Sequence, residues 1–172
     1  MPSCLFVTLL FKNRQKNNME IKVGSFITIL AYSSLVSQSF SYIIALRNMQ
    51  ESVGAETYIE IRKLLDKNFR AKFSIVFYAT FASTTILLAL SAWKGSIVLF
   101  VSVLIAWIAF IADTFFMMKG NMPINNAINS WSVNHYPADW KQYRSRWMYF
   151  FSLRQIANLS GFAILLAGCL FG

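Results

Sequence analysis

The sequence holds few charged residues and few of the side chains that bind metal ions or cross-link a chain. Charged residues make up 13% of its 172 positions, about half the share found in soluble domains, which argues against an ordinary soluble fold. Its one histidine, His135, excludes a bis-histidine metal site within one chain. Its two cysteines, Cys4 and Cys169, lie at opposite ends without CxxC spacing. We therefore expect neither a disulfide framework nor a thiolate metal site.

Motifs that bind nucleotides or build hydrolytic active sites are also missing. The sequence contains no GxGxxG, GxxxxGKS/T, HExxH or GxSxG pattern, so dinucleotide cofactors, zinc proteolysis and serine-hydrolase chemistry have no support. We accordingly expect no cofactor and no metal ion. No internal repeat is visible either, so the sequence gives no sign of the inverted halves of a transporter.

Long apolar runs dominate what is present, and 56% of the residues are hydrophobic. Four runs, near residues 23–46, 73–93, 96–118 and 147–171, reach the roughly 20 residues that a helix needs to cross a bilayer. Because hydrocarbon cannot satisfy free backbone groups, these runs predict helices. We expect an all-α, four-transmembrane-helix bundle in one domain over residues 21–172, with a tight turn at Lys94 and Gly95. Residues 1–20 are then a disordered N-terminal extension; alternatively, the natural start is Met19 and residues 1–18 precede it.

A charged amphipathic segment lies between the first two spans, at residues 55–70. One face carries the apolar residues Tyr58, Ile61, Leu65 and Phe69. The other face carries the charged residues Glu56, Glu60, Lys63 and Lys67. This pattern is typical of a helix that lies at the membrane interface. A helix that only caps the bundle fits the same pattern.

Basic residues predict the orientation of the chain, whose net charge is +9. Five basic residues lie on the side of the termini and the short turn, namely Lys12, Arg14, Lys16, Lys22 and Lys94. Ten lie on the other side, namely Arg47, Arg62, Lys63, Lys67, Arg70, Lys72, Lys119, Lys141, Arg144 and Arg146. Because cytoplasmic loops carry the excess of Lys and Arg, we expect a multi-pass protein of the cell membrane with cytoplasmic loops 47–72 and 119–146. The lipid bilayer is the expected partner, and the low overall charge gives no reason to expect nucleic acid.

A polar and aromatic stripe runs through the segment "WKQYRSRWMYFFSLRQIANLSGF", which leads into the fourth span. Helical spacing places seven of its residues on one face, namely Trp140, Arg144, Trp147, Phe151, Arg154, Asn158 and Gly161. The first span carries a second polar stripe with Ser34, Ser37, Gln38, Ser41 and Tyr42. Such residues also serve as interhelical contacts or as interfacial tryptophans. We predict a shared pocket that binds a flat aromatic substrate through Trp140, Trp147, Arg144, Asn158, Gln38 and Tyr42.

The third span ends in "DTFFMMKGNMPINNAINSW", which combines helix-breaking residues with amides. We expect Gly120 to stop the helix and Pro123 to fix the backbone after it, so that an irregular segment presents Asn121, Asn125 and Asn126. An Asn-rich turn that caps two helices is the simpler alternative.

Two ionisable residues, Asp113 and Arg154, lie inside the third and fourth spans at similar depth. An unpaired charge at that depth is costly, so we expect the two to pair. The same geometry suits catalysis, since Arg154 offers a planar fork to an anionic or carbonyl oxygen and Asp113 orients it.

Three features stand together in the second half of the chain: "GNMPINN" after the third span, the Trp-rich "DWKQYRSRW", and Arg154 where the fourth span begins. In combination they resemble the anthrone oxygenase-like family of small four-helix membrane proteins, most of which have no assigned function. The resemblance implies a common site formed by Pro123, Asn125, Trp140, Trp147 and Arg154. It also implies oxidation of a tricyclic anthrone to an anthraquinone by dioxygen.

That reaction requires removal of a carbon-bound proton, after which the enolate reacts with oxygen without a metal or flavin. Trp140 and Trp147 would form the aromatic slot. Arg154 and Asn125 would stabilise the developing oxyanion.

Two classes of function therefore remain open. One is a cofactor-independent oxidoreductase that acts on an anthrone-like or quinol-like substrate, with Asp113 or His135 as the base. The other is a non-enzymatic membrane subunit that docks a partner protein through its interfacial helix and its Trp and Arg stripe.

Overall fold

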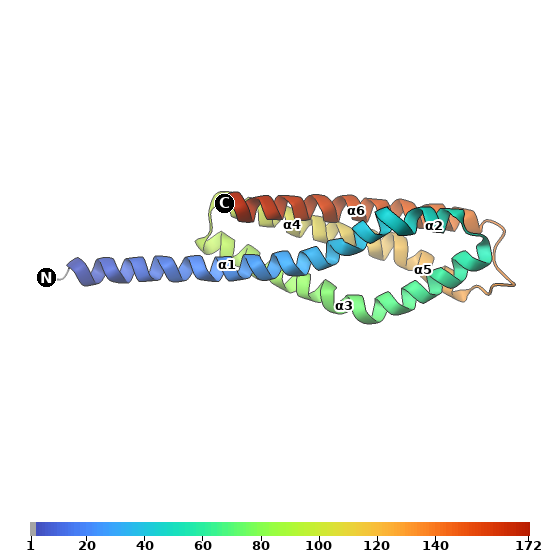
Figure 1. The fold of residues 1–172 in the computed structure, drawn as a ribbon, viewed down its shortest axis with the longest axis horizontal. Coiled ribbons are helices and arrows are strands. Elements are labelled where there is room, and N and C mark those ends of the chain that lie inside the picture. Colours follow the sequence, from blue (N-terminus) through green and yellow to red (C-terminus); the bar gives the residue numbers. More distant parts are fainter. Residues whose placement is uncertain (1–2) are drawn as a thin grey trace.

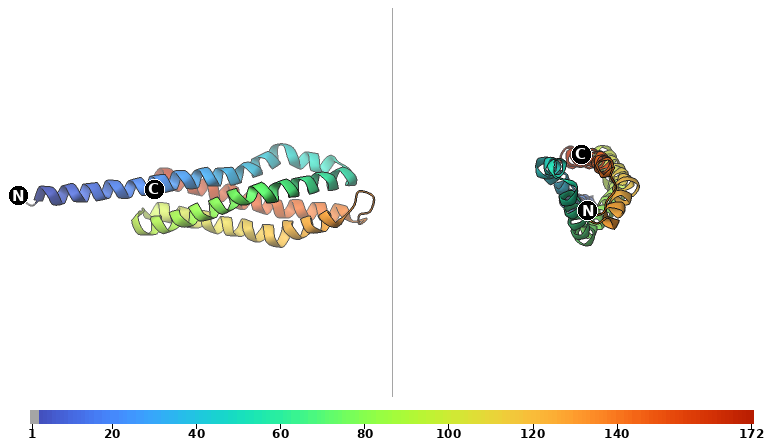
Figure 2. Two further views of the ribbon diagram at one scale, coloured as in Figure 1. Left: turned by 90° about the horizontal axis from the view of Figure 1, so that it is seen from below. Right: turned by 90° about the vertical axis from the view of Figure 1, so that its right-hand side faces the viewer.

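Helices form four columns that run side by side along the molecule (Figures 1 and 2). The computed structural model describes residues 3–172, and the side chains of residues 19–70 and 72–172. The first column joins α1 (Ser3–Ser41), the π-helical turn η1 (Tyr42–Leu46) and α2 (Arg47–Ser52), and the second is α3 (Ala55–Lys94). The third joins α4 (Ile97–Phe116), the π-helical turn η2 (Met117–Asn121) and α5 (Met122–Ser130), and the fourth is α6 (Trp140–Phe171). The side chains of the expected N-terminal extension, up to residue 18, lie outside this description.

The turn between α3 and α4 forms where the sequence predicts it. A Cβ atom on Gly95 would lie 2.7 Å from the carbonyl oxygen of Ser91, so the close return of the chain requires glycine. Ser96 then caps α4, because its hydroxyl oxygen accepts a hydrogen bond from the amide of Leu99 at 3.1 Å. This turn and the C-terminus lie at one end of the bundle, and the loop at 131–139 lies at the other (Figure 1).

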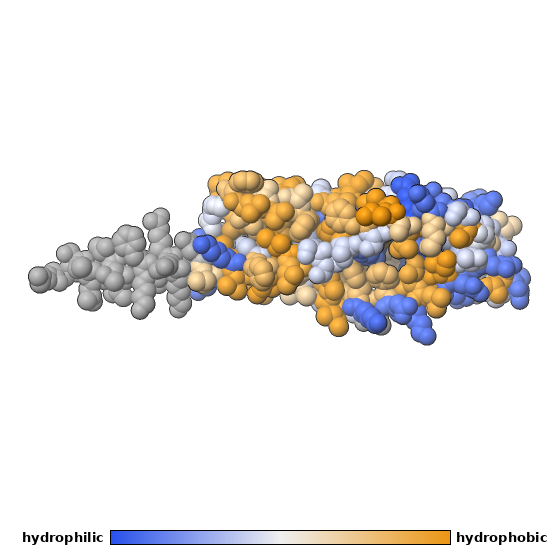
Figure 3. Space-filling model, in the orientation of Figure 1, coloured by the Kyte–Doolittle hydropathy of each residue, from blue (hydrophilic) through white to orange (hydrophobic). Residues whose placement is uncertain are grey.

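The four columns include helical stretches long and apolar enough to cross a membrane, namely Met19–Ser52, Lys72–Lys94, Ile97–Ser130 and Trp140–Phe171. Their outer faces expose large apolar side chains such as Phe26, Leu30, Ile75, Ile108 and Ile156. Figure 3 shows apolar residues over most of the visible face, with polar residues concentrated toward the end that holds the 131–139 loop. Apolar surface on this scale fits contact with lipid. The prediction of an all-α bundle with four helices long and apolar enough to cross a membrane is confirmed.

Two glycines on α6 allow close packing against neighbouring columns. A Cβ atom on Gly161 would lie 2.6 Å from the hydroxyl of Tyr32 and 2.7 Å from the Cβ of Ala109. One on Gly168 would lie 2.2 Å from the Cβ of Ser102. Small residues at such positions let transmembrane helices approach each other closely.

Residues 55–70 do not form a separate interfacial helix. They are the first turns of α3, which continues without a break to Lys94. Tyr58 and Ile59 are fully buried against α6 and α5 in a cluster that also holds Trp140 and Ile128. The expectation of an independent interfacial helix is therefore not confirmed, because this segment packs into the bundle.

The irregular segment expected after the third span is a wrong prediction, as is the helix stop at Gly120. Gly120 lies inside η2, and Pro123 lies in the first turn of α5, directly after the π-helical turn through which the helical path continues. The expected loops 47–72 and 119–146 are accordingly mostly helical. Gly120 is kept by packing, since a Cβ atom there would lie 2.1 Å from Cγ of Phe150.

The fourth helix is also longer than its expected span of 147–171, because α6 begins at Trp140. The amphipathic stripe that precedes the apolar run is part of the same helix and packs within the bundle.

Candidate ligand-binding site

A cavity of about 290 Å³ lies among all four columns, in the half of the bundle nearer the 131–139 loop. Its walls are largely aromatic, with Tyr42, Phe69, Phe73, Phe77, Tyr78, Trp147 and Phe151. Polar side chains reach it from each column, including Gln38 and Gln50, Arg62 and Asp66, Asn121 and Asn125, and Arg154. The cavity thus combines apolar walls with a few polar groups, as small-molecule sites usually do.

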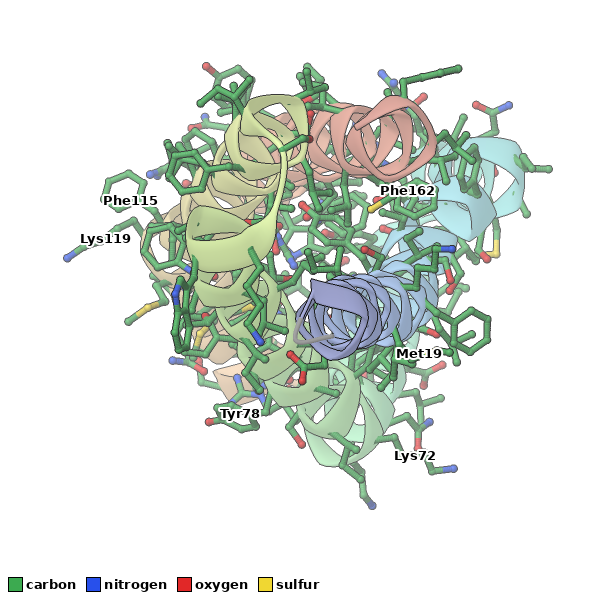
Figure 4. The ribbon with its side chains drawn as sticks, turned by 90° about the vertical axis from the view of Figure 1, so that its left-hand side faces the viewer. Met19, Lys72, Tyr78, Phe115, Lys119 and Phe162 are labelled. Atoms are coloured by element: carbon green, nitrogen blue, oxygen red, sulfur yellow. The ribbon has the colours of Figure 1, made fainter. Side chains whose placement is uncertain are left out.

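A shallower groove between the first column and α3 adjoins the cavity. The two hollows share Gln38, Leu46, Phe69 and Phe73 as lining residues. The groove also exposes Ser34, Ser37 and Ser41. Lys72 lies at its α3 side and points away from the bundle in Figure 4, as Tyr78 does. The groove therefore connects the cavity to the side of the bundle.

Both π-helical turns supply residues to the cavity. Tyr42 and Leu46 come from η1, and Met117 and Asn121 come from η2. A π-helical turn inserts an extra residue into a helix, and such turns occur often at functional sites. Here they lie on two different columns and line the same space.

The amide of Asn125 joins three of the cavity residues. Its oxygen accepts hydrogen bonds from Nη2 of Arg62 at 2.8 Å and from Nε1 of Trp147 at 2.9 Å. Its nitrogen donates to Oδ1 of Asp66 at 2.9 Å. Because both ends of the amide are bound, its orientation is fixed, and α3, α5 and α6 are tied together.

The carboxylate of Asp66 has several partners. Besides Asn125, it accepts a hydrogen bond from Nδ2 of Asn129 at 2.8 Å. It also forms an ion pair with Nε of Arg70, one turn further along α3, at 2.9 Å. Both carboxylate oxygens are therefore occupied by donors.

Arg62 is a buried cation that stacks on an aromatic ring. Its guanidinium carbon lies 3.8 Å from the centroid of the Trp147 ring, a short cation–π distance. The residue is 6% exposed, and among the described residues its Nε has no hydrogen-bond partner. Burial lowers the pKa of Arg62 below its ordinary value, and the nearby Tyr58, Tyr42 and Asp66 act in the opposite direction.

Arg154 and Asp113 form the pair that the sequence predicts. Nε of Arg154 lies 2.6 Å from Oδ1 of Asp113, and the two side chains are 9% and 0% exposed. Arg154 lines the cavity, whereas Asp113 does not. Asp113 thus pairs with Arg154 without lining the cavity itself.

Several other polar atoms around the cavity have no partner among the described residues. They are the hydroxyl of Tyr42, both amide atoms of Gln50, Nε of Arg62 and Oδ1 of Asn121. Asn121 still donates from its nitrogen to the carbonyl oxygen of Trp147 at 2.9 Å. A buried polar atom without a partner is costly, so this concentration around one cavity points to a site.

The structure brings together part of the predicted site. Gln38, Tyr42, Asn125, Trp147 and Arg154 all line the cavity. The stripe on α6 faces inward as expected, since Trp140, Trp147, Phe151, Arg154, Asn158 and Gly161 are buried.

Other predicted residues lie elsewhere. Trp140 packs against Tyr58, with ring centroids 5.9 Å apart. Arg144 donates to the carbonyl oxygens of Gln50 and Val53 at 3.1 and 3.2 Å and so closes the end of the bundle. The cavity lining does not include Trp140, Arg144, Asn158, Asp113 or the exposed residues Pro123 and His135.

Sequence reasoning missed Arg62, Asp66 and Gln50. Arg62 and Asp66 follow Tyr58 at intervals of four residues, so a helical reading could have placed them on the buried face. Gln50 carried no comparable signal.

Comparison with protein-family models, with curated proteins and with solved structures gave no match to this chain. Among the described residues, no group of three or more His, Cys, Asp or Glu side chains is placed to hold a metal ion.

Proposed function

We propose that this protein binds a flat, hydrophobic molecule with acceptor oxygens and oxidises it without a cofactor. The observation that carries the proposal is the cavity itself, which combines aromatic walls with lining residues whose polar atoms have no partner among the described residues. Phe73, Phe77 and Phe151 supply apolar walls, and the ring of Trp147 is held in place by its bond to Asn125. An anthrone-like or quinol-like substrate combines these properties, and the resemblance to the anthrone oxygenase-like family points to the same class.

The proposed reaction begins with removal of a proton from the acidic carbon of the substrate. The resulting enolate reacts with dioxygen, one oxygen atom becomes the new carbonyl group and the other leaves as water. Arg62 and Arg154 would stabilise the negative oxygen of the enolate. Asp66 is the carboxylate among the cavity residues, and among the described residues its Oδ1 accepts a single hydrogen bond, from Asn125, so we assign the base to Oδ1 of Asp66 in place of Asp113 or His135.

The test uses the full chain purified in mild detergent, with an anthrone as substrate. Formation of the anthraquinone is followed by absorbance and dioxygen uptake by an electrode, each against protein-free buffer, because anthrones oxidise slowly on their own. We expect Asp66→Asn to lower turnover by about 100-fold or more, the usual contribution of a general base. The matched control is Asp139→Asn, since Asp139 is exposed and makes no side-chain cap at the start of α6.

Substrate binding by Asp66→Asn, measured in the same preparation, separates loss of the base from loss of the fold. A wild-type rate equal to that of protein-free buffer would contradict the oxidoreductase proposal.

The alternative function, docking of a partner protein, is supported by the outer face of residues 55–70. Leu64 is 62% exposed there, beside exposed Glu60 and Lys67. The tryptophans of the α6 stripe are buried and so cannot contact a partner protein. We therefore assign docking to the outer face of residues 55–70. A stoichiometric partner that stays bound through purification would favour this function, whereas a co-purifying aromatic molecule would favour the enzyme.

We also propose that the end of the bundle with the 131–139 loop faces the cytoplasm, from the excess of basic residues at that end. Reporter fusions at Gly172 and after Ser132 should then fall on opposite sides. An active cytoplasmic reporter at Gly172 would reverse the orientation.

A further inference from the structure

The charges around the cavity do not balance. Of the arginines that line it, Arg154 pairs with Asp113 and Arg70 pairs with Asp66. Within the part of the chain that the structure describes, no carboxylate lies at ion-pair distance from Arg62. Asp66 is one turn away, but its oxygens are taken by Asn125, Asn129 and Arg70. One positive charge in the cavity is therefore left without a counter-ion.

The contacts of Arg62 are incomplete. Nη2 is bound to Asn125, and one face of the guanidinium covers Trp147. Nε has no partner, although the residue is 6% exposed. A buried, incompletely bound guanidinium is expensive in a protein interior, and an anionic ligand would remove that expense.

Two further residues can complete such a site. Gln50 is fully buried, and neither atom of its amide has a partner among the described residues. The hydroxyl of Tyr42, on the adjoining π-helical turn, is also unpartnered. Both residues line the cavity with Arg62. Together they offer N–H and O–H donors beside a cation, the combination that binds an oxyanion most strongly.

We propose that Arg62, Gln50 and Tyr42 form an anion-binding subsite, and that the ligand of the cavity is a hydrophobic organic anion with a carboxylate, phenolate or enolate oxygen. The inference rests on the proposed function in one respect, namely that the cavity holds an aromatic molecule. It goes further in naming the charge of the ligand and the residues that recognise it. Under the proposed reaction, the subsite holds the oxygen on which the enolate charge develops.

The experiment compares two fluorescent probes of nearly equal shape, anthracene-9-carboxylate and 9-anthracenemethanol. The first is ionised at neutral pH and the second is neutral. Binding to the purified full chain is measured by fluorescence titration in detergent micelles, with empty micelles as the blank. We expect the carboxylate to bind about tenfold or more tightly than the alcohol, as for hydrogen bonds to a charged group.

Variants assign this difference to the subsite. Arg62→Gln should weaken binding of the carboxylate by about tenfold or more and change binding of the alcohol by less than about twofold. Gln50→Leu should weaken carboxylate binding by about tenfold without removing any existing hydrogen bond, so it tests the subsite even where Arg62→Gln does not fold. Arg146→Gln is the control, because Arg146 is exposed and does not line the cavity.

The outcomes separate this inference from the proposed function. If both probes bind equally, or if the variants weaken both equally, the anion-binding subsite is refuted while the aromatic cavity stands. If neither probe binds to the wild-type chain, the aromatic cavity fails and the subsite fails with it.

Discussion

Replacement of Gln50 by leucine should raise the stability of the ligand-free protein. Gln50 is 0% exposed, and both of its amide atoms lack partners among the described residues. An unsatisfied buried donor or acceptor costs about 1–3 kcal/mol, and leucine has a similar size without polar atoms. We therefore expect Gln50→Leu to stabilise the fold by about 2 kcal/mol, or roughly 4–8 °C in Tm for a chain of this length.

Gln155→Leu provides the matched control. Gln155 is buried on α6, and its Nε2 donates to the carbonyl oxygen of Ser39 on α1 at 3.3 Å. Its replacement removes an interhelical hydrogen bond, so we expect a loss of about 1 kcal/mol. The two substitutions are chemically identical and should move Tm in opposite directions.

The assay is thermal unfolding in detergent, followed by tryptophan fluorescence, with and without anthracene-9-carboxylate. The probe should raise the Tm of the wild type more than that of Gln50→Leu, because the variant has lost a ligand contact. A Tm for ligand-free Gln50→Leu that falls as far as that of Gln155→Leu would refute the reasoning. It would mean that the amide of Gln50 is satisfied in the empty protein.

Three further predictions test the bundle. Arg154→Met should destabilise the fold by about 3–5 kcal/mol, since it leaves Asp113 buried and unpaired, and adding Asp113→Asn should restore most of that loss in a double-mutant cycle followed by Tm. Gly168→Ala should destabilise the fold by about 1–3 kcal/mol through overpacking, because the new Cβ would lie 2.2 Å from the Cβ of Ser102. Adding Ser102→Gly should restore the Tm, and a lowered Tm that this second substitution does not restore would contradict the packing. Burial raises the pKa of Tyr58 above its ordinary value. The contribution of neutral Tyr58 to the free energy of unfolding is therefore fully present below about pH 10, and it is lost as the pH rises through the folded-state pKa. Tyr58→Phe should therefore flatten the fall in Tm above pH 10, and an unchanged slope would count against this assignment.

The architecture could be predicted because membrane helices obey simple constraints. A bilayer sets the length of each apolar run, and the absence of water in its core demands backbone hydrogen bonds within the helix. The inward face of α6 was equally predictable, since two arginines and an asparagine, which lipid does not favour, recur at helical spacing together with two tryptophans. Burial of Trp147, Arg154 and Asn158 follows that periodicity.

Local signals misled where tertiary packing decides the structure. Gly120 and Pro123 normally end a helix, yet the helical path continues through η2 into α5. The ring of Phe150 occupies the space beside Gly120, and the π-helical turn absorbs the change in register. The contact of Gly120 with Phe150, 30 positions away, cannot be predicted from the local sequence, and neither can the extra residue in the π-helical turn.

The subsite was hidden for a related reason. Arg62 and Asp66 lie in a segment rich in charges, which normally indicates a solvated face. Their partners are far away in the chain, since Asn125 is 63 residues from Arg62 and 59 from Asp66. A single sequence shows the charges but not the amides that bury them.

The arrangement around Arg62 is difficult to explain by stability alone. Buried ionic networks contribute little net stability, and apolar residues of similar volume often replace them without loss. A network kept only for structure would also satisfy its own members, as Asp66 and Asn125 do. Arg62 and Gln50 instead line the cavity and retain polar atoms that have no partner among the described residues. Since such atoms reduce the stability of the empty protein and strengthen contact with a charged ligand, their presence is best explained by binding.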